Sequence, residues 1–141
     1  MAIDNIFGIA GTALNAQLTR MNLTASNLAN AGTKSSTAEG AFHAKRPVFK
    51  ALLDKEDTHA GAPFVGGVKI DKIVDIKEPI RKVYDPFDPQ ADSEGFVYTT
   101  NISEVVEMVE MMAAARSYQN NVEVVNTARE LMMRTLDITR A

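Results

Sequence analysis

Residues 102–141 carry a helical repeat that is long for a single globular domain. Apolar residues recur there at alternating steps of three and four, interrupted only by Arg129: Met108, Met111, Ala115, Tyr118, Val122, Val125, Met132 and Leu136. This spacing predicts one helix with an apolar stripe of the coiled-coil type. About 37 residues at 1.5 Å each would give a rod about 55 Å long. A helix of this length favours a coiled coil or a multi-helix assembly over a self-contained domain.

Capping residues mark the start of this helix. Asn101 and Glu104 have the spacing of a capping box, and Ser103 is a competing N-cap. The apolar surface is also broader than a two-stranded seam requires, because Val124, Ala128 and Leu131 lie beside it.

The first 30 residues predict a second, shorter helix with an unusual polar face. Its apolar stripe again alternates steps of four and three: Phe7, Gly11, Leu14, Leu18, Met21, Ala25 and Leu28. Asp4 and Arg20 are its only charged residues, and the outward positions are mostly Asn, Gln, Ser and Thr. Small amides and hydroxyls tolerate burial better than charges do, so this face favours packing against another chain. An ordinary amphipathic helix in a self-contained domain is the alternative.

The middle of the chain, residues 31–101, has the composition of a small β unit. Residues 31–40 are rich in Gly, Ser and Thr and predict a loop. Strands are expected at 47–53, 67–76, 80–84 and 94–100. The fold class is therefore mostly α with a small β part. We expect antiparallel terminal helices in a coiled-coil-like pairing, with a small loop-rich β lobe held out to the side. The division is a helix over 1–30, the β lobe over 31–101 and a helix over 102–141.

The sequence offers no chemistry of an enzyme. It contains no cysteine, and its two histidines, His43 and His59, lie outside any metal-ligand spacing. The acidic run Asp85, Asp88 and Asp92 lacks the glycine and terminal glutamate of a calcium loop. We therefore predict neither catalysis nor a cofactor nor a metal site. The net charge of −3 is mild, and the sequence has no block of like charge that would predict a nucleic-acid or membrane surface. No apolar run is long enough to predict insertion into a membrane. The N-terminus lacks the pattern of a cleaved signal peptide.

Both ends of the chain resemble one known family. Residues 25–33, ASNLANAGT, resemble the N-terminal signature of the bacterial flagellar rod and hook proteins. Residues 107–127 and 133–138 are similar to the C-terminal signature of the same family. The central region is far shorter than in hook and distal-rod members, which points to a proximal rod member. Residues 84–92, 95–97 and 44–49 are also similar to such a member, whereas the 33–40 loop departs from the family pattern.

The resemblance implies a structural role. Family members are exported through the flagellar type III apparatus without cleavage. They then assemble with copies of themselves and with other rod proteins into the periplasmic drive shaft of the basal body. Asn27 and Asn30 match paired asparagines of the family, and Arg116, Tyr118, Gln119 and Asn121 match its C-terminal polar cluster. The resemblance implies that these residues make subunit contacts or fix helix ends.

The stripes and the resemblance together define a predicted assembly interface. Its residues are Phe7, Leu14, Leu18, Met21, Asn27, Leu28, Asn30, Met108, Met111, Arg116, Tyr118, Asn121, Val122, Val125, Met132 and Leu136. An alternative function is an adaptor or chaperone-like module whose methionine-rich helix binds the helix of a partner. A stable monomer with both helices formed would favour that alternative.

Overall fold

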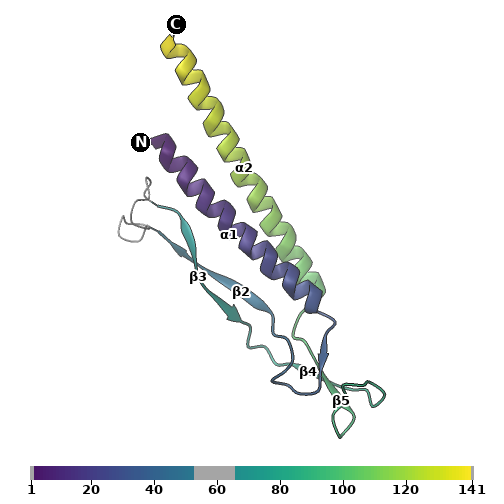
Figure 1. The fold of residues 1–141 in the computed structure, drawn as a ribbon. Coiled ribbons are helices and arrows are strands. Elements are labelled where there is room, and N and C mark those ends of the chain that lie inside the picture. Colours follow the sequence, from purple (N-terminus) through teal and green to yellow (C-terminus); the bar gives the residue numbers. More distant parts are fainter. Residues whose placement is uncertain (1, 53–65, 141) are drawn as a thin grey trace.

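Two long antiparallel helices dominate the fold. The structure is a computed structural model that describes residues 2–52 and 66–140. Helix α1 spans Ala2–Asn30 and helix α2 spans Glu104–Arg140, with 29 and 37 residues respectively. The two termini lie at the same end of the molecule, and the C-terminal end of α2 projects beyond α1 (Figure 1). The predicted mostly helical fold with paired terminal helices and a small β part is confirmed.

The start of α2 differs from the predicted capping box. Ser103 directly precedes the helix, and its carbonyl accepts a hydrogen bond from the Glu107 amide at 3.0 Å, as expected of an N-cap residue. The Asn101 side chain serves the β part instead. It accepts from the Ala44 amide at 2.9 Å and donates to the Ile76 carbonyl at 3.0 Å. The capping role predicted for Asn101 is therefore wrong.

The region between the helices forms two separate antiparallel sheets. Strands β2 and β3 pair as a two-stranded sheet, and the order of the second sheet is β1-β5-β4. Each predicted strand is present with slightly different ends, although Leu53, the last residue predicted for the first strand, lies outside the described residues. The two-residue strand β1 falls in a segment predicted as loop. The bounds are β1 Lys34–Ser35, β2 Lys45–Ala51, β3 Val68–Asp75, β4 Arg81–Tyr84 and β5 Phe96–Thr99.

The two sheets occupy different places relative to the helices. Strands β2 and β3 run along α1, whereas the β1-β5-β4 sheet lies beyond the end of the helix pair where α1 finishes (Figure 1). The Thr12 hydroxyl of α1 accepts a hydrogen bond from the Val68 amide of β3 at 3.1 Å. Only the second sheet thus resembles the side lobe expected from sequence. Part of the polar face of α1 is used inside the chain, against β2 and β3.

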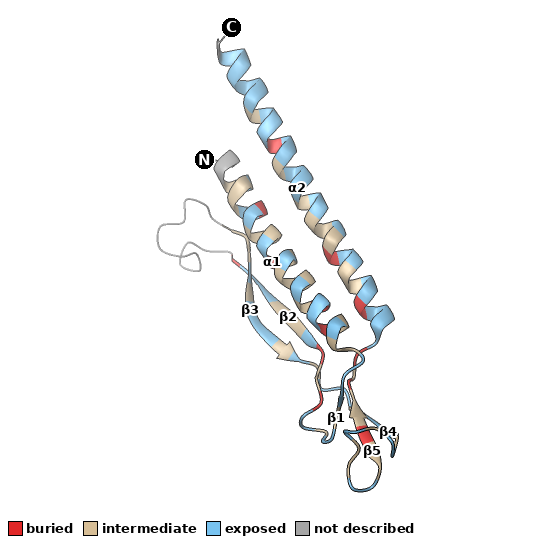
Figure 2. Cartoon of the chain, turned by 45° about the vertical axis from the view of Figure 1, so that its right-hand side comes forward, coloured by how far each residue is buried: buried red, intermediate tan, exposed pale blue. Residues whose placement is uncertain are grey.

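The buried core is thin and made largely of small residues. The buried apolar positions of the helices are Ala10, Ala16, Ala114 and Ala128. Alanines permit close approach of two helix backbones but remove little apolar surface from water. Figure 2 shows that most of α2 is exposed, above all where it extends past α1. The helix pair therefore leaves many of its large apolar side chains on the outside.

We predict that Gly95→Ala destabilises the β4–β5 connection. Gly95 has a φ of 84°, and an added Cβ would lie 3.0 Å from Tyr84 Cε2 and 3.2 Å from Pro86 Cβ. The left-handed conformation alone costs an L-residue about 1–2 kcal/mol. Urea denaturation should show at least this loss in the free energy of unfolding.

Gly11→Ala is the matched control for this substitution. Gly11 lies inside α1, and a Cβ there would meet nothing within 4 Å. The same change should therefore raise helix stability by up to about 1 kcal/mol. Equal effects of the two substitutions would contradict the conformation assigned to Gly95.

Candidate assembly interface

The stripe of α2 that is covered within the chain is offset by one residue from the predicted stripe. The covered positions that alternate steps of four and three are Glu107, Met111, Ala114, Tyr118, Asn121, Val125, Ala128 and Met132. Glu110, Ala115 and Ser117 are also half-buried. Four of these eight positions in the stripe, Met111, Tyr118, Val125 and Met132, also belong to the predicted stripe. The other four lie one residue before the corresponding position of the predicted stripe. The offset explains why Arg129 interrupted the predicted stripe, because Ala128 occupies that place. Sequence reasoning preferred the apolar Met108 and Val122 to the polar Glu107 and Asn121.

Helix α1 shows a similar difference. Its buried positions are Ala10, Ala16, Thr24 and Asn27. Three positions of the predicted stripe are exposed instead: Gly11, Leu18 and Ala25. The covered arc of α1 is wide because α2 and the β2–β3 sheet contact the helix from different directions. A stripe chosen for one partner helix could not anticipate the second contact.

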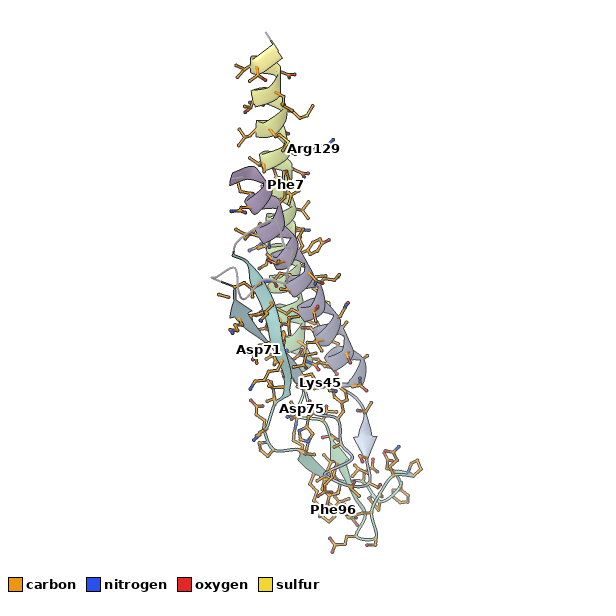
Figure 3. All side chains as sticks on the ribbon, turned by 60° about the vertical axis from the view of Figure 1, so that its left-hand side comes forward. Phe7, Lys45, Asp71, Asp75, Phe96 and Arg129 are labelled. Carbon is orange, nitrogen blue, oxygen red and sulfur yellow. The ribbon has the colours of Figure 1, made fainter. Side chains whose placement is uncertain are left out.

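The predicted interface residues divide into three groups by exposure. Asn27 alone is buried within the chain. The half-buried group is Phe7, Leu14, Met21, Leu28, Asn30, Met111, Tyr118, Asn121, Val125 and Met132. The exposed group is Leu18, Met108, Arg116, Val122 and Leu136. Figure 3 labels Phe7 on α1, near the end where that helix begins, and Arg129 on α2.

A polar cluster of Asn27, Lys45, Arg46 and Glu107 joins α1, α2 and β2. The Asn27 side chain is fully buried, accepts from the Lys45 amide at 2.9 Å and donates to the Lys45 carbonyl at 3.0 Å. Its amide nitrogen also lies 3.0 Å from Glu107 Oε2, as a second acceptor. Glu107 is 2% exposed and receives both Arg46 Nη1 at 2.8 Å and Arg46 Nη2 at 2.5 Å. This cluster fixes the two helices and the strand in one register.

Sequence reasoning missed Glu107 and Arg46. A weak signal for Glu107 existed, because it keeps the four-and-three spacing with Met111 and Ala114. A second ion pair, Arg20 with Glu110, links the helices beside the polar cluster. The hydrogen bond from Arg20 lowers the pKa of the Glu110 carboxyl. Both ion pairs lie near the end of the helix pair where α1 finishes.

Two apolar surfaces of α2 remain exposed. Val105, Met108, Val109 and Met112 recur at positions i, i+3, i+4 and i+7, so they share one face of the helix, and each is at least half exposed. Near the C-terminus, the exposed apolar residues are Leu131, Met133, Leu136 and Ile138. Contiguous exposed apolar surface of this kind marks interaction sites in soluble proteins.

Comparison with known proteins accounts for both helices. Residues 7–34 match the family described as "Flagella basal body rod protein", and residues 93–138 match "Flagellar basal body rod FlgEFG protein C-terminal". The chain is 43% identical over 138 residues to the flagellar basal-body rod protein FlgC of Salmonella typhimurium, covering 98% of both chains. It is 32% identical over 149 residues to FlgC of Bacillus subtilis, covering 98% of this chain and 99% of that one. The chain belongs to the flagellar basal-body rod protein family.

The family matches coincide with the helix pair. The first covers most of α1, and the second covers nearly all of α2. The resemblance inferred from sequence, including its similarity to the FlgC member, is confirmed. The Asn27 and Glu107 side chains of this rod-family protein both lie in the matched regions.

The loop before β5 is held by ion pairs and backbone hydrogen bonds. Lys34 Nζ lies 2.5 Å from Asp88 Oδ2 and 3.2 Å from Asp85 Oδ2. Asp92 Oδ1 accepts from the backbone amides of Glu94 and Phe96, each at 2.9 Å. The hydrogen bond from Lys34 lowers the pKa of Asp88, and that from the Phe96 amide lowers the pKa of Asp92. The hydrogen bond with Asp88 raises the pKa of Lys34.

These directions predict how the stability of the rod-family chain depends on pH. A carboxyl with a lowered folded-state pKa contributes stability above its ordinary pKa, and this is lost as the pH falls through the folded value. The ordinary pKa is 3.8 for Asp88 and Asp92 and 4.5 for Glu110. As the pH falls below these values, the stabilisation that the three carboxylates contribute should be lost. The contribution of Lys34 is present below 10.5 and is lost as the pH rises through its raised pKa.

Thermal unfolding measured from about pH 7 to about pH 3 tests the acid side of this prediction. Asp92→Asn should show a smaller fall in melting temperature over this range than the wild type. Glu78→Gln, at an exposed position, is the control and should follow the wild type. A wild-type fall no larger than that of Asp92→Asn would contradict the role of Asp92.

The histidines singled out in the sequence analysis form no metal site among the described residues. His43 is half-buried, with Nδ1 at 3.3 Å from the Ile76 carbonyl oxygen, and His59 lies outside the described residues. Among residues 2–52 and 66–140, no group of His, Cys, Asp and Glu side chains is placed to hold a metal ion. In the same described ranges, no helix is both long and apolar enough to cross a membrane.

Proposed function

We propose that this protein is a structural subunit of the proximal rod in the bacterial flagellar basal body, and not an enzyme. The single observation that carries the proposal is its identity, over nearly its whole length, to proteins named as flagellar basal-body rod protein FlgC. The subunit self-assembles through its terminal helices and contributes to the shaft that transmits torque. Its partners are copies of itself and other rod proteins.

The exposed faces of the helix pair support this proposal. Met108, Val122 and Leu136, all in the predicted interface, are 51%, 37% and 50% exposed in the isolated chain. If the two helices covered all of each other's apolar faces, such residues would be buried within the chain. Each Å² of apolar surface that a neighbouring subunit covers contributes about 25 cal/mol of stabilisation. Covering these side chains would therefore favour assembly.

Membership of the rod family supports a proposed site of action in the flagellar basal body. The chain functions in the basal body, in the periplasm, after passing through the flagellar type III export apparatus without cleavage. Export in an unpaired state is compatible with the composition of α1, whose Asn, Ser and Thr residues are poor helix formers. The helix gains stability mainly when α2, the β2–β3 sheet and neighbouring subunits cover it.

Sedimentation of the purified full chain over a concentration series tests the proposal. The wild type should associate as concentration rises, and a variant combining Met108→Ser, Val122→Ser and Leu136→Ser should remain monomeric. Urea denaturation should show that the variant monomer is folded, because these side chains are exposed. Matched control substitutions on exposed polar positions of α2, Asn126→Ser, Thr135→Ser and Thr139→Ser, should associate like the wild type.

Two results would count against the proposal. Association of the serine variant at wild-type concentrations would remove these faces from the interface. A wild type that stays a compact monomer throughout would favour the adaptor alternative.

A further inference from the structure

Helix α2 carries two pairs of adjacent methionines, and in each pair one side chain is covered and the other is exposed. Met111 and Met132 belong to the covered stripe and are half-buried. Met112 and Met133, the residues that follow them, are 71% and 54% exposed. Successive side chains of a helix point about 100° apart, so each pair directs one sulfur toward the covered stripe and the other toward solvent.

Met108 and Met112 belong to the exposed apolar surface that they form with Val105 and Val109. Met108 is 51% exposed, and the two methionines are four residues apart, so they are neighbours on the helix surface. The chain contains no cysteine, so no thiol competes with these thioethers for an oxidant. Two of the four side chains of this surface can therefore change from apolar to polar by one kind of reaction.

The reaction is the transfer of one oxygen atom from a hydroperoxide to the thioether sulfur. The sulfur lone pair attacks the peroxide, an S–O bond forms and the O–O bond breaks. The sulfur is oxidised by two electrons, and hydrogen peroxide is reduced to water. The oxidant must reach the sulfur, so exposed thioethers react before covered ones. The sulfoxide product is polar, and burying it in an apolar contact without a donor is unfavourable.

We propose that Met108 and Met112 form an oxidation site that switches off association of the free chain and leaves its fold intact. The inference rests on the proposed self-assembly and adds a chemical control of it. Met111 and Met132 are partly covered within the chain, so they stay reduced and the helix pair persists. A neighbouring subunit that covers the surface also shields its two sulfurs, so oxidation acts on chains that have not yet assembled.

Mass spectrometry of the peroxide-treated full chain tests the selectivity of the site. In dilute monomer, fragmentation of the peptides should show Met108 and Met112 oxidised several-fold faster than Met111. Association at high concentration should slow the oxidation of Met108 and Met112. Met111 is the internal control, because it is adjacent to Met112 in sequence and differs from it in exposure. Equal rates for Met111 and Met112 would overturn the proposal.

Sedimentation of the treated chain tests the effect on association. The oxidised wild type should associate at least about tenfold more weakly than the untreated chain, as expected when a polar group is buried without a partner. Its urea transition should be unchanged, because both side chains are exposed in the fold. Methionine sulfoxide reductases, which transfer the sulfoxide oxygen to water while a dithiol becomes a disulfide, should restore association.

The combined variant Met108→Leu and Met112→Leu is the matched control. Leucine keeps the surface apolar at similar volume and carries no sulfur. The untreated variant should associate like the wild type, and peroxide should leave its association unchanged although the exposed Met133 is oxidised. Loss of association in the treated variant would assign the effect to another surface and overturn the site.

The untreated wild type separates failure of this inference from failure of the proposed function. A wild type that associates equally before and after oxidation of Met108 and Met112 would overturn the oxidation site and leave self-assembly standing. A wild type that does not associate at any concentration before treatment would overturn both.

Discussion

Replacing Glu107 by alanine should lower the free energy of unfolding by about 3 kcal/mol. Removing one partner of a buried ion pair typically costs about 3–5 kcal/mol, since the remaining charge loses its partner. The lower end of that range applies, because the Arg46 side chain is 26% exposed and can recover some hydration. The Asn27 amide, which is fully buried, also loses one of its acceptors. Urea denaturation of the monomer at low concentration measures the loss.

Glu130→Ala is the matched control for Glu107→Ala. Glu130 lies on the same helix and is exposed, so its removal should change stability by less than about 0.5 kcal/mol. A double-mutant cycle with Arg46→Ala should then give a coupling energy of at least about 1 kcal/mol between Arg46 and Glu107. Equal losses for Glu107→Ala and Glu130→Ala would contradict the buried position of Glu107.

Asn27→Asp should destabilise the chain by a similar amount, about 2–4 kcal/mol, although it barely changes the shape of the side chain. The amide nitrogen of Asn27 donates to the Lys45 carbonyl and to Glu107. An aspartate oxygen at that place has no proton to donate, leaving a buried acceptor unsatisfied and setting two carboxylates side by side. The fold should recover in part on acidification, as the new carboxyl becomes protonated.

The same substitution at Asn22 is the control. Asn22 is exposed on α1, so Asn22→Asp introduces the same charge without burying it. Thermal unfolding should place Asn22→Asp close to the wild type and Asn27→Asp well below it. An Asn27→Asp variant with the stability of Asn22→Asp would mean that Asn27 does not hold β2 against the helix pair.

The sequence predicted the helices because their evidence is local and repeated. Each stripe extends over many turns, so a single exception such as Arg129 does not obscure it. The choice of stripe was less secure, because a one-residue shift keeps the same spacing. In the structure, the covered stripe of α2 includes the buried Glu107. A rule that assigns apolar residues to the interior cannot predict a buried glutamate. Its partner Arg46 is distant in sequence, so no local pattern connects them.

The β region was predicted in content but not in arrangement. Alternation revealed β2 and β3, while nothing local indicates that they lie along α1 rather than away from it. That placement depends on hydrogen bonds between distant residues, such as Val68 to Thr12 and Lys45 to Asn27. Asn101 shows the same limitation. Its position before a helix favours a cap, yet its side chain binds Ala44 and Ile76.

The candidate interface was predicted only as a set of helix positions. Periodicity cannot distinguish residues that pair the two helices within one chain from residues that contact another chain. In the structure, Met108, Val122 and Leu136 are exposed, whereas Asn27 is buried within the chain.

Electron microscopy of isolated basal bodies is the decisive measurement for a structural role in the rod. In the bacterium that encodes this chain, deleting its gene should leave basal bodies without a complete rod or hook. Expression of the wild-type chain should restore both, and the chain should be found in the purified basal bodies. The combined Met108→Ser, Val122→Ser and Leu136→Ser variant should fail to restore them although it folds. Complete rods in the deletion strain, or wild-type rods lacking this chain, would contradict the proposed function.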